Sequence, residues 1–224
     1  MQRHTVMREN RLVARVAIVW ISIVWISNLA IAQDRSPIRL LIAGTPVAQA
    51  QRGIELGVAE MAQTAKLLKR DVQVVTAPAS GDAIDGVIAG AGGRTLKREI
   101  PQLHLGPLPK DAGPCSFTLA TPAKAQEVTW HPALDRYGAS ELNERFVKRY
   151  RSGMTADAYA GWIAVKALVE AALRPAATGD KCAALGRLRF DGHKGRPLTF
   201  DPVSRALQQP LYVLDGDGVA EVKR

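Results

Sequence analysis

Short apolar runs recur through the first half of the chain, and most of them end close to glycine or proline. Runs of this length between turn-forming residues are typical of buried β-strands. They predict strands over residues 37–44, 71–79, 84–92, 101–107 and 116–122.

The stretches between and after these runs have helical spacing. Residues 48–68 carry Ile54, Val58 and Met61 on one face, and a short helix is expected over 93–99. Strands that alternate with helices indicate an α/β fold, in which a parallel sheet has helices on its faces.

The second half has longer helices and ends in a hairpin pattern. Residues 139–150 place Leu142, Phe146 and Tyr150 four apart, which predicts an amphipathic helix. A more apolar helix is predicted over 155–175, where a proline closes it. Two Asp-Gly pairs within 210–222 predict a β-hairpin, because such pairs supply the positive φ that tight turns need.

The first 32 residues are typical of a secretory signal peptide. An apolar run over 17–32 ends with Ala30 and Ala32 at the spacing of a cleavage site. Four arginines precede that run: Arg3, Arg8, Arg11 and Arg15. The alternative is a membrane anchor, but the run of 16 residues is shorter than the roughly 20 that span a bilayer. We therefore expect cleavage after Ala32 and a periplasmic protein.

Removal of this leader would leave 192 residues and lower the net charge from +9 to +6. A chain of this length makes one domain or slightly more. Its positive charge is spread out instead of gathered into a run, so nucleic acid is not expected as a partner. Cys115 and Cys182 are the two cysteines, and an even count in an oxidising compartment favours a disulfide. Two buried free thiols are the alternative.

No sequence motif supports an enzyme. The Gly-rich segment 90–95 lies where backbone N–H groups can hold an anion, but it lacks the dinucleotide-binding spacing. A tight turn between a strand and a helix is the preferred interpretation. Hydrolase elbows, zinc-protease motifs and redox cysteine pairs are absent from the sequence, and we expect no cofactor.

The histidines that follow the leader do not form a metal site. His104, His131 and His193 are far apart in sequence, with no cysteine at ligand spacing. His104 alternates with apolar residues and is expected to pack within a strand. Trp130 and His131 could line a cleft, although packing of the aromatic side chain in an extended segment is the simpler interpretation.

The order of these segments resembles a known family. "IRLLIAG", "GIELGVAEM", "DVQVVTAPA" and "DGVIAG" resemble the first lobe of substrate-binding proteins of branched-chain amino acid-type ABC transporters, the type I periplasmic binding proteins. "VTWHPALDRYGASELNERF", "AYAGWIAVKALVEAALRP" and "FDGHKGRPLTFDPVSRALQQPLYVL" are similar to the C-terminal part of one branch. That branch accompanies pyrroloquinoline-quinone-dependent alcohol dehydrogenase systems.

The resemblance implies a Rossmann-like three-layer lobe with a shortened second lobe. Family members have two lobes, but here the segment after the last predicted strand leads almost directly into the final crossover. Lobe one would comprise 33–122 and 139–194. The crossover strands and the remnant of lobe two would comprise 123–138 and 195–224. The family topology also puts both cysteines in the same lobe, where a bridge is plausible.

The resemblance further implies a binding protein without catalysis. Its ligand would lie at the carboxyl ends of the strands. The residues expected on that face are Gly90, Gly92, Thr95, Pro107, Trp130, His131 and Tyr159. Amino acids are disfavoured as ligands, because Thr95 is the only hydroxyl in the loops where the family binds a carboxylate. Expected partners are a small molecule and an ABC permease, or alternatively a periplasmic quinoprotein dehydrogenase or its cytochrome.

The segment "FDGHKGRPLTFDP", residues 190–202, resembles the family's Gly-rich turn before a late strand. Phe190 and Phe200 would anchor its ends. His193, Lys194 and Arg196 are then expected to face water, and a basic patch that faces a partner is the alternative. No catalytic cluster is expected there.

Overall fold

The computed structural model describes residues 36–79, 81–93, 99–120, 124, 126–174, 179–215 and 218–222. The predicted leader, Thr95 and most of the short helix predicted over 93–99 lie outside these residues. The chain from Ser36 onward forms one compact unit.

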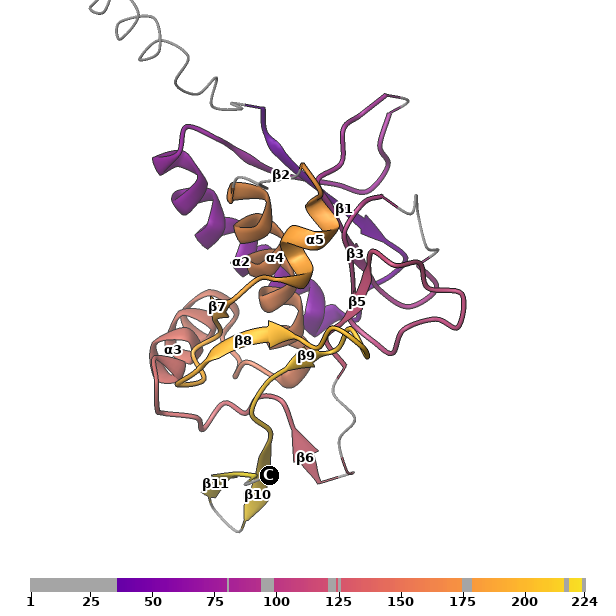
Figure 1. Ribbon diagram of the computed structural model, residues 1–224. Helices are drawn as coiled ribbons and strands as arrows, with labels where there is room; N and C mark the ends of the chain where they lie inside the picture. Colours follow the sequence, from indigo (N-terminus) through magenta and orange to yellow (C-terminus); the bar gives the residue numbers. More distant parts are fainter. Residues whose placement is uncertain are drawn as a thin grey trace, which may run out of the picture. The chain divides into compact units, whose positions relative to one another are not determined.

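A parallel sheet of five strands is the centre of the fold (Figure 1). Its order is β2-β1-β3-β4-β5, and every neighbouring pair is parallel. The strands are β1 (Ile38–Ala43), β2 (Val72–Val75), β3 (Gly86–Ala89), β4 (Gln102–His104) and β5 (Ser116–Thr118). All five strands predicted from the apolar runs are present, each shorter than its run, and the α/β class is confirmed.

Two helices pack together against one face of this sheet and form what we call the helix layer. They are α2 (Ala48–Leu67) and α4 (Ala156–Leu173), and Figure 1 shows them side by side. Glycines allow the close approach: a Cβ added at Gly161 would lie 2.1 Å from the carbonyl oxygen of Ala50. Ile38, Leu40 and Leu103 from the sheet join both helices in one apolar core.

The other face of the sheet is more polar. Because side chains alternate along a strand, the neighbours of Leu103 point away from the helix layer. Gln102, His104, Ser116 and Thr118 are all buried there. The connections 76–85, 90–101 and 105–115 contain no helix among their described residues. The connections 76–85 and 105–115 are shorter than the roughly a dozen residues that a helical crossover between parallel strands needs.

The remaining elements are smaller. Helix α3 (Ala139–Tyr150) has the predicted bounds, and α5 (Lys181–Gly186) follows α4. The predicted hairpin is confirmed as β10 (Tyr212–Asp215) and β11 (Gly218–Glu221), and β10 also pairs with β6 (Glu127–Val128). A second small sheet contains β7 (Phe190–Asp191), β8 (Pro197–Phe200) and β9 (Leu207–Gln208).

A disulfide joins Cys115, immediately before β5, to Cys182 in α5. The two Cα atoms are 5.2 Å apart, which is within the range that a disulfide needs. The predicted pairing is therefore confirmed. Within the described part of the chain, no helix is long and apolar enough to cross a membrane.

Candidate functional site

The Gly-rich segment after β3 lies at the carboxyl edge of the sheet and packs by its backbone. The N–H of Gly90 donates to the carbonyl of Ala43 at 2.9 Å. A Cβ added at Gly90 would come within 2.6 Å of the Pro46 nitrogen. Glycine is needed there because the loops after β1 and β3 touch. This geometry is that of a tight turn, the interpretation preferred from the sequence.

Other residues expected on the ligand face are more open. Gly92 has a φ of +71°, and a Cβ there would meet nothing within 4 Å. Pro107, in the loop after β4, is exposed. His131 is half-buried, and its Nδ1 accepts a hydrogen bond from the N–H of Ala133 at 3.2 Å. Thr95 lies outside the described residues.

Trp130 and Tyr159 are brought together, but inside the core. Each is 1% exposed, and their rings stack with centroids 4.3 Å apart. The Tyr159 hydroxyl donates to the carbonyl of Gly192 at 2.7 Å. Burial raises the pKa of Tyr159 well above its ordinary value, so the phenol stays protonated and acts as a donor. In this arrangement both rings are buried beneath the surface of the expected ligand face and do not line it.

Asn143 in α3 positions the segment that carries Trp130 and His131. Its Oδ1 accepts from Trp130 Nε1 at 2.9 Å, and its Nδ2 donates to the carbonyls of Pro132 and Leu134 at 2.9 and 3.1 Å. The sequence interpretation did not include this residue. The available signal was an amide three positions before Phe146, on the apolar face of a predicted amphipathic helix.

Lys194 corrects the expectation that this loop is solvated. It is only 2% exposed, and its Nζ donates to the carbonyls of Thr129 and Pro210, the latter at 3.3 Å. The ammonium also faces three aromatic rings. Its distances to the ring centroids are 4.7 Å for Tyr159, 4.7 Å for Tyr212 and 5.6 Å for Trp130. We call Lys194 with these three rings and two carbonyls the Lys194 cluster.

Burial sets the electrostatics of the Lys194 cluster. It lowers the pKa of Lys194 to about 7, while the carboxylate of Glu221 acts in the opposite direction and Arg196 adds to the decrease. Burial likewise raises the pKa of Tyr212 to about 12, with Glu221 adding to the increase. The expectation that the loop residues face water also fails for His193. This residue is half-buried and stacks on Trp162, with ring centroids 5.4 Å apart. Arg196 is exposed, as expected.

A cavity of about 770 Å³ lies beside the Lys194 cluster. It is bounded by the segment before α3 and by the β10–β11 hairpin. Tyr137 contributes an exposed ring, Tyr212 contributes to the wall, and Arg136 and Glu221 bring opposite charges. These groups can bind a small molecule by aromatic contact and hydrogen bonding.

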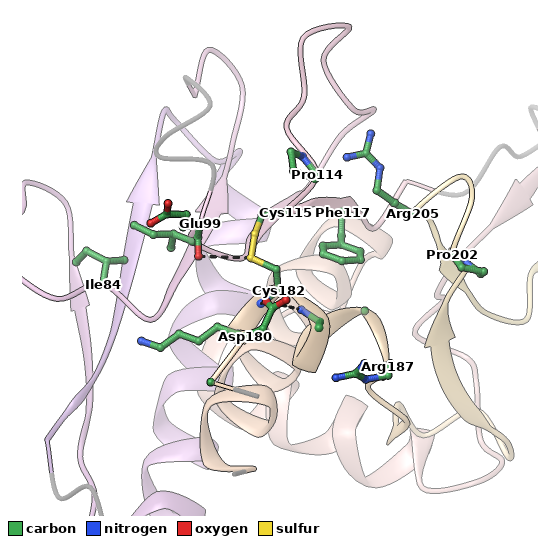
Figure 2. A pocket seen from close by; sticks show the side chains of 15 residues that line it. Ile84, Glu99, Pro114, Cys115, Phe117, Asp180, Cys182, Arg187, Pro202 and Arg205 are labelled. Carbon is green, nitrogen blue, oxygen red and sulfur yellow. Dashed lines mark hydrogen bonds between the residues drawn. A yellow bond between two sulfur atoms is a disulfide. The ribbon is translucent and has the colours of Figure 1, made fainter. Parts of the chain in front are cut away.

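A second cavity, of about 910 Å³, lies at the amino ends of β3, β4 and β5 (Figure 2). The Cys115–Cys182 disulfide is part of its lining, together with Phe117 and several basic side chains. The described residues contain no group of three or more His, Cys, Asp or Glu residues that could hold a metal ion.

No protein-family model matches the sequence, and no curated protein sequence matches it. Solved structures do match the fold. A protein from Rhodospirillum rubrum, described as a branched-chain amino acid ABC transporter, superposes with a TM-score of 0.61 at 11% sequence identity. The match covers 83% of this chain and 99% of that one. The fold is that of a type I periplasmic binding protein lobe.

Two further structures match with lower TM-scores. A solute-binding protein from R. palustris in complex with benzoate has a TM-score of 0.33 at 16% identity, over 84% of this chain and 57% of that one. A branched-chain amino acid substrate-binding protein from Streptococcus pneumoniae in complex with isoleucine has 0.37 at 10% identity, over 85% and 60%. The chain thus spans about three fifths of the length of these two proteins.

Proposed function

We propose that this chain is a periplasmic solute-binding protein of the kind that serves ABC transporters, and that it has no catalytic activity. The observation that supports this most is the fold around the parallel sheet, since 83% of this chain superposes on 99% of the R. rubrum chain. Export rests on the signal peptide expected to end at Ala32. A small-molecule ligand and an ABC permease are the proposed partners, and nucleic acid is not one.

We also propose that the second lobe is reduced. Lobe one comprises 33–122 and 139–194, while 123–138 and 195–224 supply crossover strands and a remnant of lobe two. In support, the part of the chain that the structure describes has one parallel sheet and two small sheets of three strands each. A full second lobe would enclose a ligand from the other side, so this protein would bind with fewer contacts.

The proposed ligand face is the carboxyl edge of the sheet, where α/β folds present their sites. It is formed by Gly90, Gly92, Thr95, Pro107, Trp130, His131 and Tyr159. Among those that the structure describes, Gly92 and Pro107 are exposed and His131 is half-buried, which supports a role for these three in ligand contact. Trp130 and Tyr159 would act through the backbone that they support.

A thermal-shift screen tests the proposal directly. Amino acids, short alcohols, aldehydes and quinone cofactors would be added to the mature protein, and a true ligand raises Tm because it binds only the folded state. The site is then mapped with Pro107→Trp, which should abolish the shift by filling the ligand face. Leu67→Trp is the matched control, because Leu67 is 84% exposed at the far end of α2. No shift with any compound would contradict solute binding.

The second candidate is an interaction module that docks to a periplasmic quinoprotein dehydrogenase or its cytochrome. It is favoured by the sequence resemblance to the quinoprotein-associated branch and by the single parallel sheet among the described residues. Co-purification from the native periplasm distinguishes the two functions. Recovery of a dehydrogenase or cytochrome without any ligand-induced Tm shift supports docking, whereas a monomer without a partner argues against it.

A further inference from the structure

We propose that the cavity beside the Cys115–Cys182 disulfide is a second binding site, which takes a small organic carboxylate with an apolar body. Its place in the fold separates it from the proposed ligand face. Ile84 precedes β3, Ile100 precedes β4 and Cys115 precedes β5, so the cavity lies at the amino edge of the sheet. Its volume of about 910 Å³ suits a small molecule.

The walls of this cavity are held in place before any ligand arrives. The disulfide ties the start of β5 to α5, so the two sides of the cavity are covalently linked. Phe117 contacts Phe200 edge to face at 5.1 Å, and a Cβ added at Gly186 would lie 3.3 Å from the Phe117 ring. A site that is already formed loses little entropy when it binds.

The apolar part of the lining fits an apolar ligand body. Pro114 and Pro202 lie on the same side of the disulfide as Phe117, and Ile84 lies on the other side (Figure 2). Ile100 also lines the cavity. Burial of a ligand's phenyl or branched alkyl group against such side chains is favourable by about 25 cal/mol per Å² of apolar area.

The charges of the lining leave arginine donors available. Lys181 is paired with Asp85 at 2.7 Å. The Asp180 carboxylate accepts from the N–H groups of Cys182 and Ala183, each at 2.9 Å, so both of these charged groups already have partners.

The two arginines are the carboxylate donors in this proposal. Arg205 donates one Nη1 hydrogen bond to the carbonyl of Gly113 and keeps further N–H groups. The backbone N–H of Arg187 donates to the carbonyl of Ala183, but its guanidinium has no hydrogen bond or ion pair among the described residues. Figure 2 shows both guanidinium groups on the Phe117 side, while Glu99 lies near Ile84. A guanidinium binds a carboxylate through two parallel hydrogen bonds, which fixes its orientation.

Titration of the oxidised mature protein with three probes tests the site. The probes are 3-phenylpropionate, the neutral 3-phenylpropionamide and acetate, each followed by protein NMR. We expect 3-phenylpropionate to bind in the millimolar range or better, and the other two to bind at least about tenfold more weakly, because each lacks one half of the recognition.

Variants then assign the carboxylate contact. Arg187→Gln should weaken 3-phenylpropionate binding about tenfold, and Arg187→Lys should restore part of it as a point charge. Arg189→Gln is the matched control, because Arg189 is exposed nearby but does not line the cavity. Thermal melts check that all variants fold. The proposal would be overturned if the amide bound as tightly as 3-phenylpropionate, or if 3-phenylpropionate did not bind. It would also be overturned if Arg187→Gln left the affinity for 3-phenylpropionate unchanged.

This site does not rest on the proposed function. Pro107→Trp at the carboxyl edge should leave 3-phenylpropionate binding unchanged, and Arg187→Gln should leave the Tm shift of any carboxyl-edge ligand unchanged. Failure of one site therefore remains distinguishable from failure of the other.

Discussion

The helix layer and the Lys194 cluster are two buried regions that are held together by different physical means. In the helix layer, α2 and α4 are joined by apolar side chains and by glycines that let their backbones approach closely. In the Lys194 cluster, one ammonium connects the backbones of Thr129 and Pro210 and three aromatic rings. The first region depends on shape, and the second depends on satisfied polar groups.

The two regions therefore respond to different changes. A close-packed apolar interface is disturbed by added volume, because neighbouring backbone cannot give way. A buried ammonium is sensitive to pH, because burial disfavours its charged form. Tyr159 and Trp162 of α4 stack together at 5.9 Å, and Tyr159 belongs to the Lys194 cluster, so the two regions share a helix and can be compared within one protein.

The largest effect of any substitution is expected from Gly161→Val in the helix layer. The new Cβ would lie 2.1 Å from the Ala50 carbonyl oxygen, so α2 and α4 must separate. We expect the free energy of unfolding to fall by about 3 kcal/mol or more, measured by urea denaturation. Gly106→Ala is the control, because a Cβ there meets nothing within 4 Å. A loss below about 1 kcal/mol for Gly161→Val would contradict shape-limited packing.

An effect of similar size is expected from reduction of the disulfide, which joins the start of β5 to α5 by a covalent bond. Its sequence separation of 67 gives a stabilisation of about 4 kcal/mol in the chain-entropy model. The reduced protein should therefore melt well below the oxidised one. Thiol titration of denatured, non-reduced protein should find no free cysteine. Two titratable thiols in protein from an oxidising compartment would rule out the bridge.

The sequence predicted the helix layer well and the Lys194 cluster poorly, for a physical reason. Apolar spacing in 48–68 and 155–175 reports which side faces a core, and both helices formed there. Lys194 lies in a Gly-rich loop, where a charged residue normally faces water. Its burial depends on segments near Thr129 and Pro210, which are far away in sequence.

The candidate site divides in the same way. The glycine turn at Gly90 was predictable because it follows an apolar strand directly. The very short strands β6, β7 and β9 were not predicted, since two residues are too few to show a period. The role of Asn143 was not predicted either. The cavity beside the disulfide also escaped sequence reasoning, because Ile84, Phe117 and Arg205 come from separate segments that only the folded chain unites.

The third prediction uses pH to single out the Lys194 cluster. Burial lowers the pKa of Lys194 from 10.5 to about 7, so the unfolded chain binds this proton more tightly than the folded one. Deprotonated Lys194 carries no such penalty, so the free energy of unfolding is highest above pH 10.5. It falls as the pH is lowered from 10.5 to about 7, where the folded protein also takes up the proton. Between pH 6 and pH 9 we expect the free energy of unfolding to rise by about 2 to 3 kcal/mol.

Lys194→Met is the control for this pH dependence. It keeps an unbranched apolar chain of similar length against the three rings and removes the titrating group. The difference in unfolding free energy between wild type and variant should then vary with pH by the amount stated above. If both proteins show the same pH profile by urea denaturation, Lys194 does not titrate in this window.

The smallest effect is expected at His104, on the sheet face that the helix layer does not cover. Burial lowers the pKa of His104, and the nearby Arg205 adds to this, so the folded protein holds the imidazole neutral. Its contribution to stability is complete above pH 6.5 and is lost as the pH falls through the lowered value.

The Nε2 atom finds no hydrogen-bond partner among the described residues, so little is lost when the ring is replaced. His104→Gln should change the free energy of unfolding at pH 8 by about 1 kcal/mol or less, and should flatten the acid side of the profile. His193, whose pKa burial also lowers, stays in both proteins, so the difference between the two urea profiles isolates His104. An unchanged acid profile would show that His104 does not take up a proton on unfolding in this range, and a loss well above 1 kcal/mol at pH 8 would show that this polar face is packed as closely as the helix layer.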